Sequence, residues 1–119
     1  MYTPEHLADS IAKIKEYGEE EGRDMSDFTF GMYIFSAVNE DNDTGTKYAA
    51  EKLSVQYAQD FSQLVHKYAL AGSPDSCQAR LREYVDAGAS MVFVSSACPP
   101  EYIDQNMEML AKDVIPAFR

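Results

Sequence analysis

Two runs of apolar residues, without alternation between apolar and polar side chains, most constrain what this chain can fold into. The first spans Phe28 to Val38 and reads FTFGMYIFSAV, and the second reads MVFV from Met91 to Val94. Because apolar side chains occupy odd and even positions alike, each strand requires cover on both faces. Such runs are typical of parallel strands covered by helices, whereas a half-exposed antiparallel strand alternates. The sequence therefore predicts an α/β fold with about two parallel strands.

Two helices are expected to begin with the same capping signal, 70 positions apart in the sequence, at residues 3 and 73. Thr3-Pro4-Glu5 and Ser73-Pro74-Asp75 each place a hydroxyl that can cap free backbone N–H groups before a proline at the first helical position. Glycine at 18 and 88 marks the expected ends, although the charged run after Gly18 allows the first helix to extend to about Gly22. The repeat supports an array of βα units. The residues predicted to face the core are Leu7, Ile11, Ile14, Cys77, Leu81 and Val85.

The remaining helical segments bring the expected total to four or five helices. Asn39 to Gly45 reads as a polar loop, and residues 46–70 predict one long helix or two short ones. A last helix is expected to begin at Pro99-Pro100-Glu101 and to end near Pro116. Its inward side chains are predicted to be Ile103, Met107, Leu110 and Val114.

Two strands cannot by themselves form a stable sheet of this kind. Both need apolar cover on two faces, and both need hydrogen-bonding neighbours along their edges. We therefore expect residues 1–119 to form a single partial domain. The missing strands would come from upstream sequence, which we favour, from another chain, or from neither.

Charge and composition exclude several classes of function. Twenty acidic and ten basic side chains give a net charge of −10, which repels nucleic acid and anionic lipid. No run approaches the roughly 18 apolar residues of a membrane span. Cys77 and Cys98 are too far apart for a redox or zinc motif, which favours a reducing, cytoplasmic setting. His6 and His66 lie in no metal-binding spacing, so we predict no metal site.

The segment from Ala71 to Val94, AGSPDSCQARLREYVDAGASMVFV, resembles the C-terminal region of the luciferase-like monooxygenases. The shared features are a Gly-Ser-Pro helix start, a leucine-bearing amphipathic helix, an Ala-Gly-Ala turn and a hydrophobic strand. Leu110-Ala111 and the final residues 115–119, Ile-Pro-Ala-Phe-Arg, resemble the closing segment of that family.

The resemblance implies the C-terminal part of a TIM (β/α)8 barrel, with Phe28–Val38 as its seventh strand and Met91–Ala97 as its eighth. It also implies a fragment of a flavin-dependent oxidoreductase or monooxygenase that acts on a small-molecule organic substrate. The cofactor of the complete protein would be FMN or a deazaflavin coenzyme. By itself the chain is expected to be inactive, because the part that holds most flavin contacts in such enzymes is absent.

Candidate site residues follow from the position of active sites in TIM barrels, which lie where the strands end. The positions after the two predicted strands are Asn39, Ser95 and Ser96, whose side chains could bind a cofactor or simply form turns. Ser73 with Pro74 could bind phosphate at a helix start, although plain capping is the simpler interpretation. His6 and His66 are expected outside the site.

Aromatic residues of the two runs have two possible roles. Tyr33, Phe35 and Phe93 fit barrel packing better than stacking on a ring.

Two alternatives to the flavin-dependent enzyme remain open at this point. The chain could be a stand-alone α/β module that completes its sheet by self-association, as a homo-oligomer. It could also be a piece of a TIM barrel with another chemistry.

Overall fold

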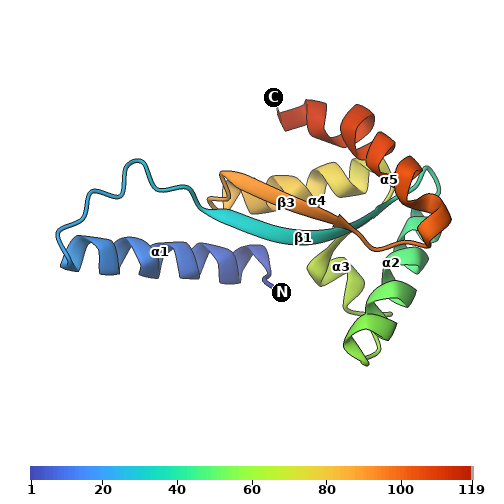
Figure 1. Ribbon diagram of the computed structural model, residues 1–119, viewed down its shortest axis with the longest axis horizontal. Helices are drawn as coiled ribbons and strands as arrows, with labels where there is room; N and C mark the ends of the chain where they lie inside the picture. Colours follow the sequence, from blue (N-terminus) through green and yellow to red (C-terminus); the bar gives the residue numbers. More distant parts are fainter. Residues whose placement is uncertain (119) are drawn as a thin grey trace.

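The computed structural model describes residues 1–118, and Arg119, the last residue of the predicted closing segment, lies outside them. The fold is α/β, with helices packed around a small sheet (Figure 1). In chain order the elements are α1 (Pro4–Glu20), β1 (Gly31–Val38), α2 (Asn42–Tyr57), α3 (Val65–Tyr68), β2 (Ala69–Gly72), α4 (Pro74–Asp86), β3 (Met91–Ser96), the 3₁₀ turn η1 (Pro100–Tyr102), α5 (Ile103–Met109), the π-helical turn η2 (Leu110–Val114) and the 3₁₀ turn η3 (Ile115–Phe118).

The sheet is parallel throughout, in the order β2-β1-β3. Strand β1 pairs with β3 from Gly31↔Met91 to Ser36↔Ser96, which confirms the predicted parallel pairing of the two apolar runs. On its other side, only residues 35–38 of β1 pair with β2. Strand β2 was not predicted, because its sequence Ala-Leu-Ala-Gly is too short to show a period and follows a helix directly.

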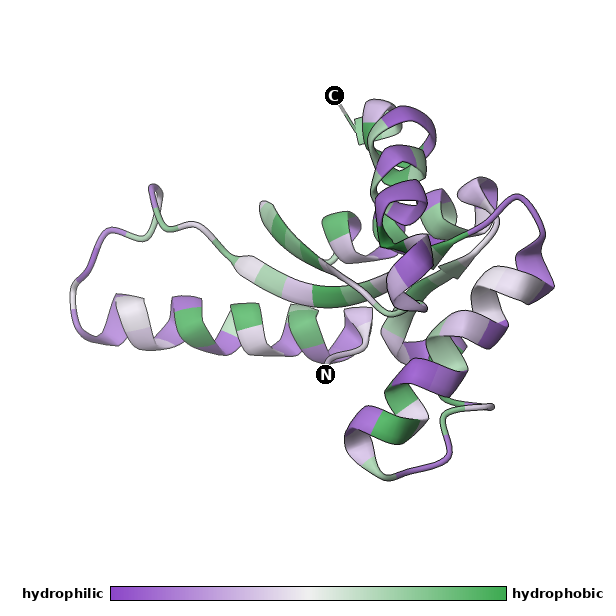
Figure 2. Cartoon of the chain, turned by 45° about the vertical axis from the view of Figure 1, so that its right-hand side comes forward, coloured by the Kyte–Doolittle hydropathy of each residue, from purple (hydrophilic) through white to green (hydrophobic). Residues whose placement is uncertain are grey.

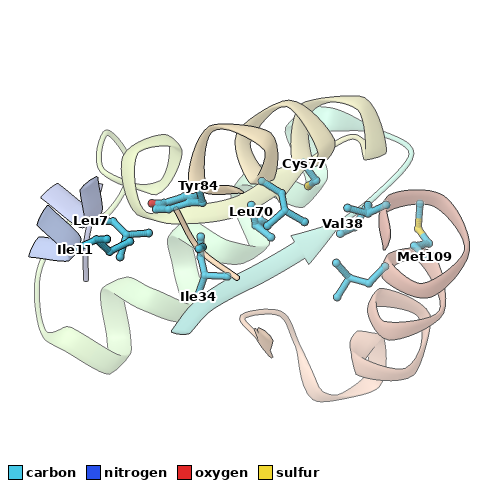
Figure 3. Close-up of a cluster of buried hydrophobic side chains, with 12 residues drawn as sticks. Leu7, Ile11, Ile34, Val38, Leu70, Cys77, Tyr84 and Met109 are labelled. Carbon is cyan, nitrogen blue, oxygen red and sulfur yellow. The ribbon is translucent and has the colours of Figure 1, made fainter. Parts of the chain in front are cut away.

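Alternate residues of β1 point to opposite faces of the sheet and pack on different helices. Ile34 and Val38 join side chains of α1, α4 and the C-terminal helix in one core cluster, shown in Figure 3. Phe35 and Ala37 join α2, Phe61 and α3 in a second cluster. We call these two sides of the sheet the even face and the odd face, after the residue numbers on β1.

The amino-terminal half of the odd face is bare. Tyr33 and Phe93 are each 57% exposed, and Met91 is 47% exposed. The prediction that both faces of both strands are buried is therefore wrong for this half. An apolar run indicates that a strand needs packing partners on both faces, but within residues 1–118 no helix or strand packs on this half of the odd face. Figure 2 shows these strands as largely hydrophobic ribbons.

Both predicted helix caps are confirmed, but two predicted core residues are not. Thr3 Oγ1 accepts a hydrogen bond from the backbone N–H of His6, and Ser73 Oγ accepts one from that of Ser76, each at 3.2 Å. Ile14 and Val85 are exposed. Helix α1 runs past Gly18 and away from the sheet, as Figure 1 shows, and its buried residues end at Ile11. On α4 the buried position is Tyr84, one residue before Val85.

The C-terminal helix, formed by η1, α5 and η2, buries a different side from the one predicted. Ile103 and Met107 are exposed, whereas Tyr102, Asn106, Leu110 and Val114 are buried. A four-residue spacing drifts around an ideal helix of 3.6 residues per turn, and the wider π-helical turn η2 compensates for this drift. Leu110 and Val114 were predicted correctly. In the described part of the chain, no helix combines the length and the apolar character that a membrane crossing requires.

Candidate functional site at the strand ends

The carboxyl ends of the three parallel strands meet at one edge of the sheet. The backbone N–H of Asn39 donates to the carbonyl of Gly72 at 2.9 Å, and that of Ala97 donates to the carbonyl of Ser36 at 2.8 Å. Ligand sites of barrels and open α/β sheets lie at this edge. We call the segments that follow the strands, residues 39–46, 72–76 and 97–101, the strand-end rim.

Asn106 joins the ends of β1 and β3 from the even face. Its side chain is fully buried on α5, where Oδ1 accepts a hydrogen bond from the backbone N–H of Val38 at 2.8 Å. Its Nδ2 donates to Ser96 Oγ at 2.9 Å and lies 3.2 Å from Ser36 Oγ. One amide therefore satisfies polar groups of two neighbouring strands inside an apolar layer, where unpaired groups are costly.

Tyr102 holds the residue that follows β1. Its hydroxyl donates to the carbonyl of Val38 and accepts from Asn39 Nδ2, each at 3.0 Å. Asn39 Oδ1 in turn accepts from the backbone N–H of Asp41 at 2.8 Å. Burial raises the pKa of the Tyr102 hydroxyl above its ordinary value, and the hydrogen bond from Asn39 opposes this rise. The hydroxyl stays protonated at neutral pH and keeps its donor role.

The loops after β1 and β2 cross at close range because two glycines allow it. A Cβ at Gly45 would lie 2.7 Å from the carbonyl oxygen of Ala37 and 2.9 Å from Gly72 Cα. Gly72 has a φ of +116°, a conformation that side-chain-bearing residues rarely adopt. Asn42 Oδ1 closes the crossing by accepting from the backbone N–H of Ser73 at 2.9 Å.

The structure brings two of the three predicted cofactor-binding residues into one network. Asn39 and Ser96 are linked through Tyr102, Val38 and Asn106, and their side chains are used in hydrogen bonds within the protein. Ser95 pairs with Phe35 and so belongs to the odd face. Cofactor binding by these residues stays a prediction.

The other residues weighed from the sequence lie away from the strand ends or serve structure. His6 stacks on Tyr2, with ring centroids 4.1 Å apart, in the first turns of α1. His66 is exposed on α3, and Ser73 caps α4. Phe35 packs in the core of the odd face as expected, whereas Tyr33 and Phe93 are more than half exposed, although the Tyr33 ring lies edge-on to that of Phe35 with centroids 5.2 Å apart.

Tyr102 and Asn106 were missed by the sequence analysis. Asn106 is a polar residue between apolar ones, and a search for an apolar stripe passes over it. The four-residue spacing of Tyr102, Asn106, Leu110 and Val114 is the signal that could have found both.

No group of three or more His, Cys, Asp or Glu residues within residues 1–118 could hold a metal ion. Both cysteines are buried and free. Burial raises the pKa of the Cys77 thiol to about 12 and also raises that of Cys98. Neither thiol is therefore a nucleophile at neutral pH, because the thiolate is the reactive form.

The sequence matches no family model and no curated protein, but solved structures resemble the whole chain. A coenzyme F420-dependent tetrahydromethanopterin reductase from Methanopyrus kandleri is similar over 98% of this chain and 43% of its own, with 19% identity and a TM-score of 0.66. An F420-dependent secondary alcohol dehydrogenase, solved with an F420-acetone adduct, is similar over 99% of this chain and 41% of its own, with 16% identity and a TM-score of 0.81.

A monooxygenase from Streptomyces bottropensis is similar over 100% of this chain and 40% of its own, with 14% identity and a TM-score of 0.75. The likeness establishes the fold. These neighbours are TIM-barrel enzymes of the luciferase-like kind, and the chain spans about two fifths of their length. Its parallel sheet is consistent with part of such a barrel, and the resemblance to the luciferase-like family is supported at the level of the fold.

The strand-end rim fits only some parts of a flavin or deazaflavin coenzyme. It offers neutral hydrogen-bonding groups, among them Asn39, and Ser95 lies beside it at the end of β3. A coenzyme phosphate needs cationic side chains or free N–H donors. The three segments of the rim contain no lysine, arginine or histidine. The rim therefore offers the phosphate no cationic side chain, and its carboxylates disfavour an anion there.

Proposed function

We propose that this chain is the C-terminal part of a deazaflavin- or flavin-dependent oxidoreductase or monooxygenase that acts on a small organic substrate. Similarity to three enzymes of this kind over nearly the whole chain supports the proposal. In such enzymes the coenzyme supplies the electron chemistry, and the protein binds, orients and shields the reactants.

The observation that carries the proposal is the bare half of the odd face. The interior of a TIM barrel is filled by layers of side chains from alternate strands, so the inner face of a strand pair is apolar and needs the opposite strands for cover. Tyr33 and Phe93 are neighbours in register and more than half exposed, whereas α1, α4 and α5 cover most of the even face, where Val94 is 40% exposed. Helices on the even face and an open apolar surface on the amino-terminal half of the odd face are what a barrel segment would present, although α2 and α3 cover the other half of the odd face.

Within this enzyme, the chain would supply one wall of the barrel and part of the rim around the substrate. Asn106 and Tyr102 would act as positioning residues, because they fix the ends of β1 and β3 without presenting free groups of their own. Ser95, on the odd face and half-buried, would be the side chain of this wall nearest to a ligand inside the barrel.

Coenzyme binding by the protein purified from its natural source tests the proposal. Coenzyme F420 and FMN are titrated separately, and the change in coenzyme absorbance and fluorescence is recorded. We expect one of them to bind, with loss of binding in Asn106→Ala and retention in Gln105→Ala, whose side chain is exposed beside it. If neither coenzyme binds the folded protein, the proposal is rejected.

The same bare face favours a second candidate, a module that self-associates. Two copies could cover Tyr33 and Phe93 of each other, since no charged residue lies on β1 or β3. Light scattering after size exclusion distinguishes the two: a discrete homo-oligomer that binds neither coenzyme supports the module. In that case Phe93→Lys should dissociate it, whereas Tyr17→Lys, at an exposed tyrosine on α1, should not.

A further inference from the structure

We propose that the strand-end rim excludes anions, so that the ligand facing it is neutral or cationic and a coenzyme phosphate is held by residues outside this chain. The statement about the phosphate rests on the proposed function. The statement about the charge of the ligand depends only on the residues of the rim.

The charge of the rim has one sign. Its carboxylates are exposed and come from all three segments: Glu40, Asp41, Asp43, Asp75 and Glu101. Glu40 and Asp75, from different segments, line one shallow groove, which Asp113 also lines. The negative charges therefore surround the strand ends and do not belong to a single acidic loop.

Several backbone donors of the rim, at positions where many α/β proteins bind phosphate, are already used within it. The N–H of Asp41 donates to Asn39 Oδ1, and that of Ser73 donates to Asn42 Oδ1 at 2.9 Å. The N–H of Ser76 donates to Ser73 Oγ, and Pro74 has no N–H to offer. The first-turn N–H groups of α2 have no side-chain cap, so a phosphate that bound them would lie beside the carboxylates of Asp41 and Asp43.

The helix dipoles do not outweigh the negative charge of the rim. Helices α2 and α4 begin at the rim, and each helix N-terminus is equivalent to about half a positive charge. These two half charges face five full negative charges. Asp43 and Asp75, in the first turns of the two helices, already occupy the positions where an anion would gain most from the dipoles.

Two lysines near the rim have carboxylate neighbours, and the charge of a third, Lys52, acts on Cys98 in the rim. Lys112, which lines the groove with Glu40 and Asp75, forms an ion pair with Glu108. Lys47, one residue past the rim on α2, lies 3.8 Å from Glu51. Both pairs are exposed, so they reduce the positive potential near the rim without adding rigid anion-binding groups.

Paramagnetic cosolutes test the proposal without any coenzyme. Three nitroxides of similar size, carrying an ammonium, a neutral amide or a carboxylate, are added to the isotope-labelled protein, and relaxation of each backbone amide is measured by NMR. At low salt we expect the cationic probe to relax the rim amides at least about threefold more strongly than the anionic probe, since surface potentials exceed kT. The exposed, uncharged residues Met91 and Phe93 serve as the internal reference.

The ratio of relaxation by the cationic probe to relaxation by the anionic probe should be larger for the rim amides than for Met91 and Phe93. In about 1 M salt, where the Debye length is about 3 Å, the ratio at the rim should approach one. Glu40→Gln with Asp75→Asn should lower it, and Glu16→Gln on α1 should not. An equal or stronger effect of the anionic probe at the rim would overturn the proposal, as would saturable shifts of rim amides with inorganic phosphate. Failure to bind coenzyme rejects the proposed function alone, because neither measurement requires coenzyme.

Discussion

Asn106 Oδ1 accepts a hydrogen bond from the backbone N–H of Val38 at 2.8 Å, across 68 residues of sequence. Because the same amide donates to Ser96, the C-terminal helix joins the ends of the two longest strands. The substitution Asn106→Ala should leave the backbone N–H of Val38 buried without a hydrogen-bond acceptor. We expect the free energy of unfolding to fall by about 1–3 kcal/mol in urea denaturation.

Gln105→Ala is the matched control for this variant, because Gln105 is exposed one position earlier on the same helix. It should change the free energy of unfolding by less than about 0.5 kcal/mol. Equal losses in the two variants would mean that the helix, and not the hydrogen bonds of Asn106, limits stability.

Two glycine-to-alanine substitutions should have opposite effects. In Gly45→Ala, the new Cβ would meet backbone atoms of Ala37 and Gly72 at under 3.0 Å, so the crossing of two loops must open. We expect a loss of about 1–3 kcal/mol, as for other overpacked sites, despite the better helix propensity of alanine. Thermal unfolding measures the change.

Gly18→Ala provides the contrast, since its Cβ would meet only the flexible side chain of Met25. Gly18 lies within α1, so alanine should add up to about 1 kcal/mol of stability. A gain in Gly45→Ala would show that the close approach of the loops is not tight.

The Cys77 thiol should be unreactive in the folded protein. Its pKa is raised from the ordinary 9.0 to about 12 by burial. A folded-state pKa above the unfolded value gives a contribution to stability that is complete below about pH 9 and is lost as the pH rises toward 12.

A thiol reagent such as dithionitrobenzoate, applied to the Cys98→Ala variant at pH 8, should react at least about tenfold more slowly with native than with urea-unfolded protein. Alkaline titration of the same variant, compared with Cys98→Ala/Cys77→Ala, should show extra loss of stability above pH 9 only while the thiol is present. Rapid native reaction would contradict the burial of Cys77.

The bare strand face should tolerate substitution that the core does not. Phe93 is 57% exposed, so Phe93→Ser should cost at most about 1 kcal/mol, mainly through strand propensity. Phe61 is 2% exposed in the core of the odd face, and Phe61→Ala should cost about 3–5 kcal/mol. Chemical denaturation measures both.

If another part of a barrel or a second copy covers this face in the protein from its natural source, Phe93→Ser should become costly there. Binding of a hydrophobic dye provides a second measurement, because it should decrease in Phe93→Ser only while the face is open. A large cost in a verified monomer would contradict the exposure of Phe93.

Local signals in the sequence determined the helix starts, the two long strands and their parallel pairing. A threonine or serine before proline acts through neighbouring backbone N–H groups, and an unbroken apolar run records the need for cover on two faces. Both kinds of information reside within a few consecutive residues. The α/β class with a parallel sheet and the helix caps at Thr3 and Ser73 were therefore predicted correctly.

Only the tertiary structure decided where cover is present and which polar residues meet. Strand β2 is too short to show a period, and it exists because Phe35 to Val38 offer it an edge. Tyr102 and Asn106 reach the strand ends because a π-helical turn keeps a four-residue spacing on one side of the C-terminal helix. The sequence indicates that Tyr33 and Phe93 need apolar packing partners. Whether their side chains are buried depends on which other parts of the structure pack against them.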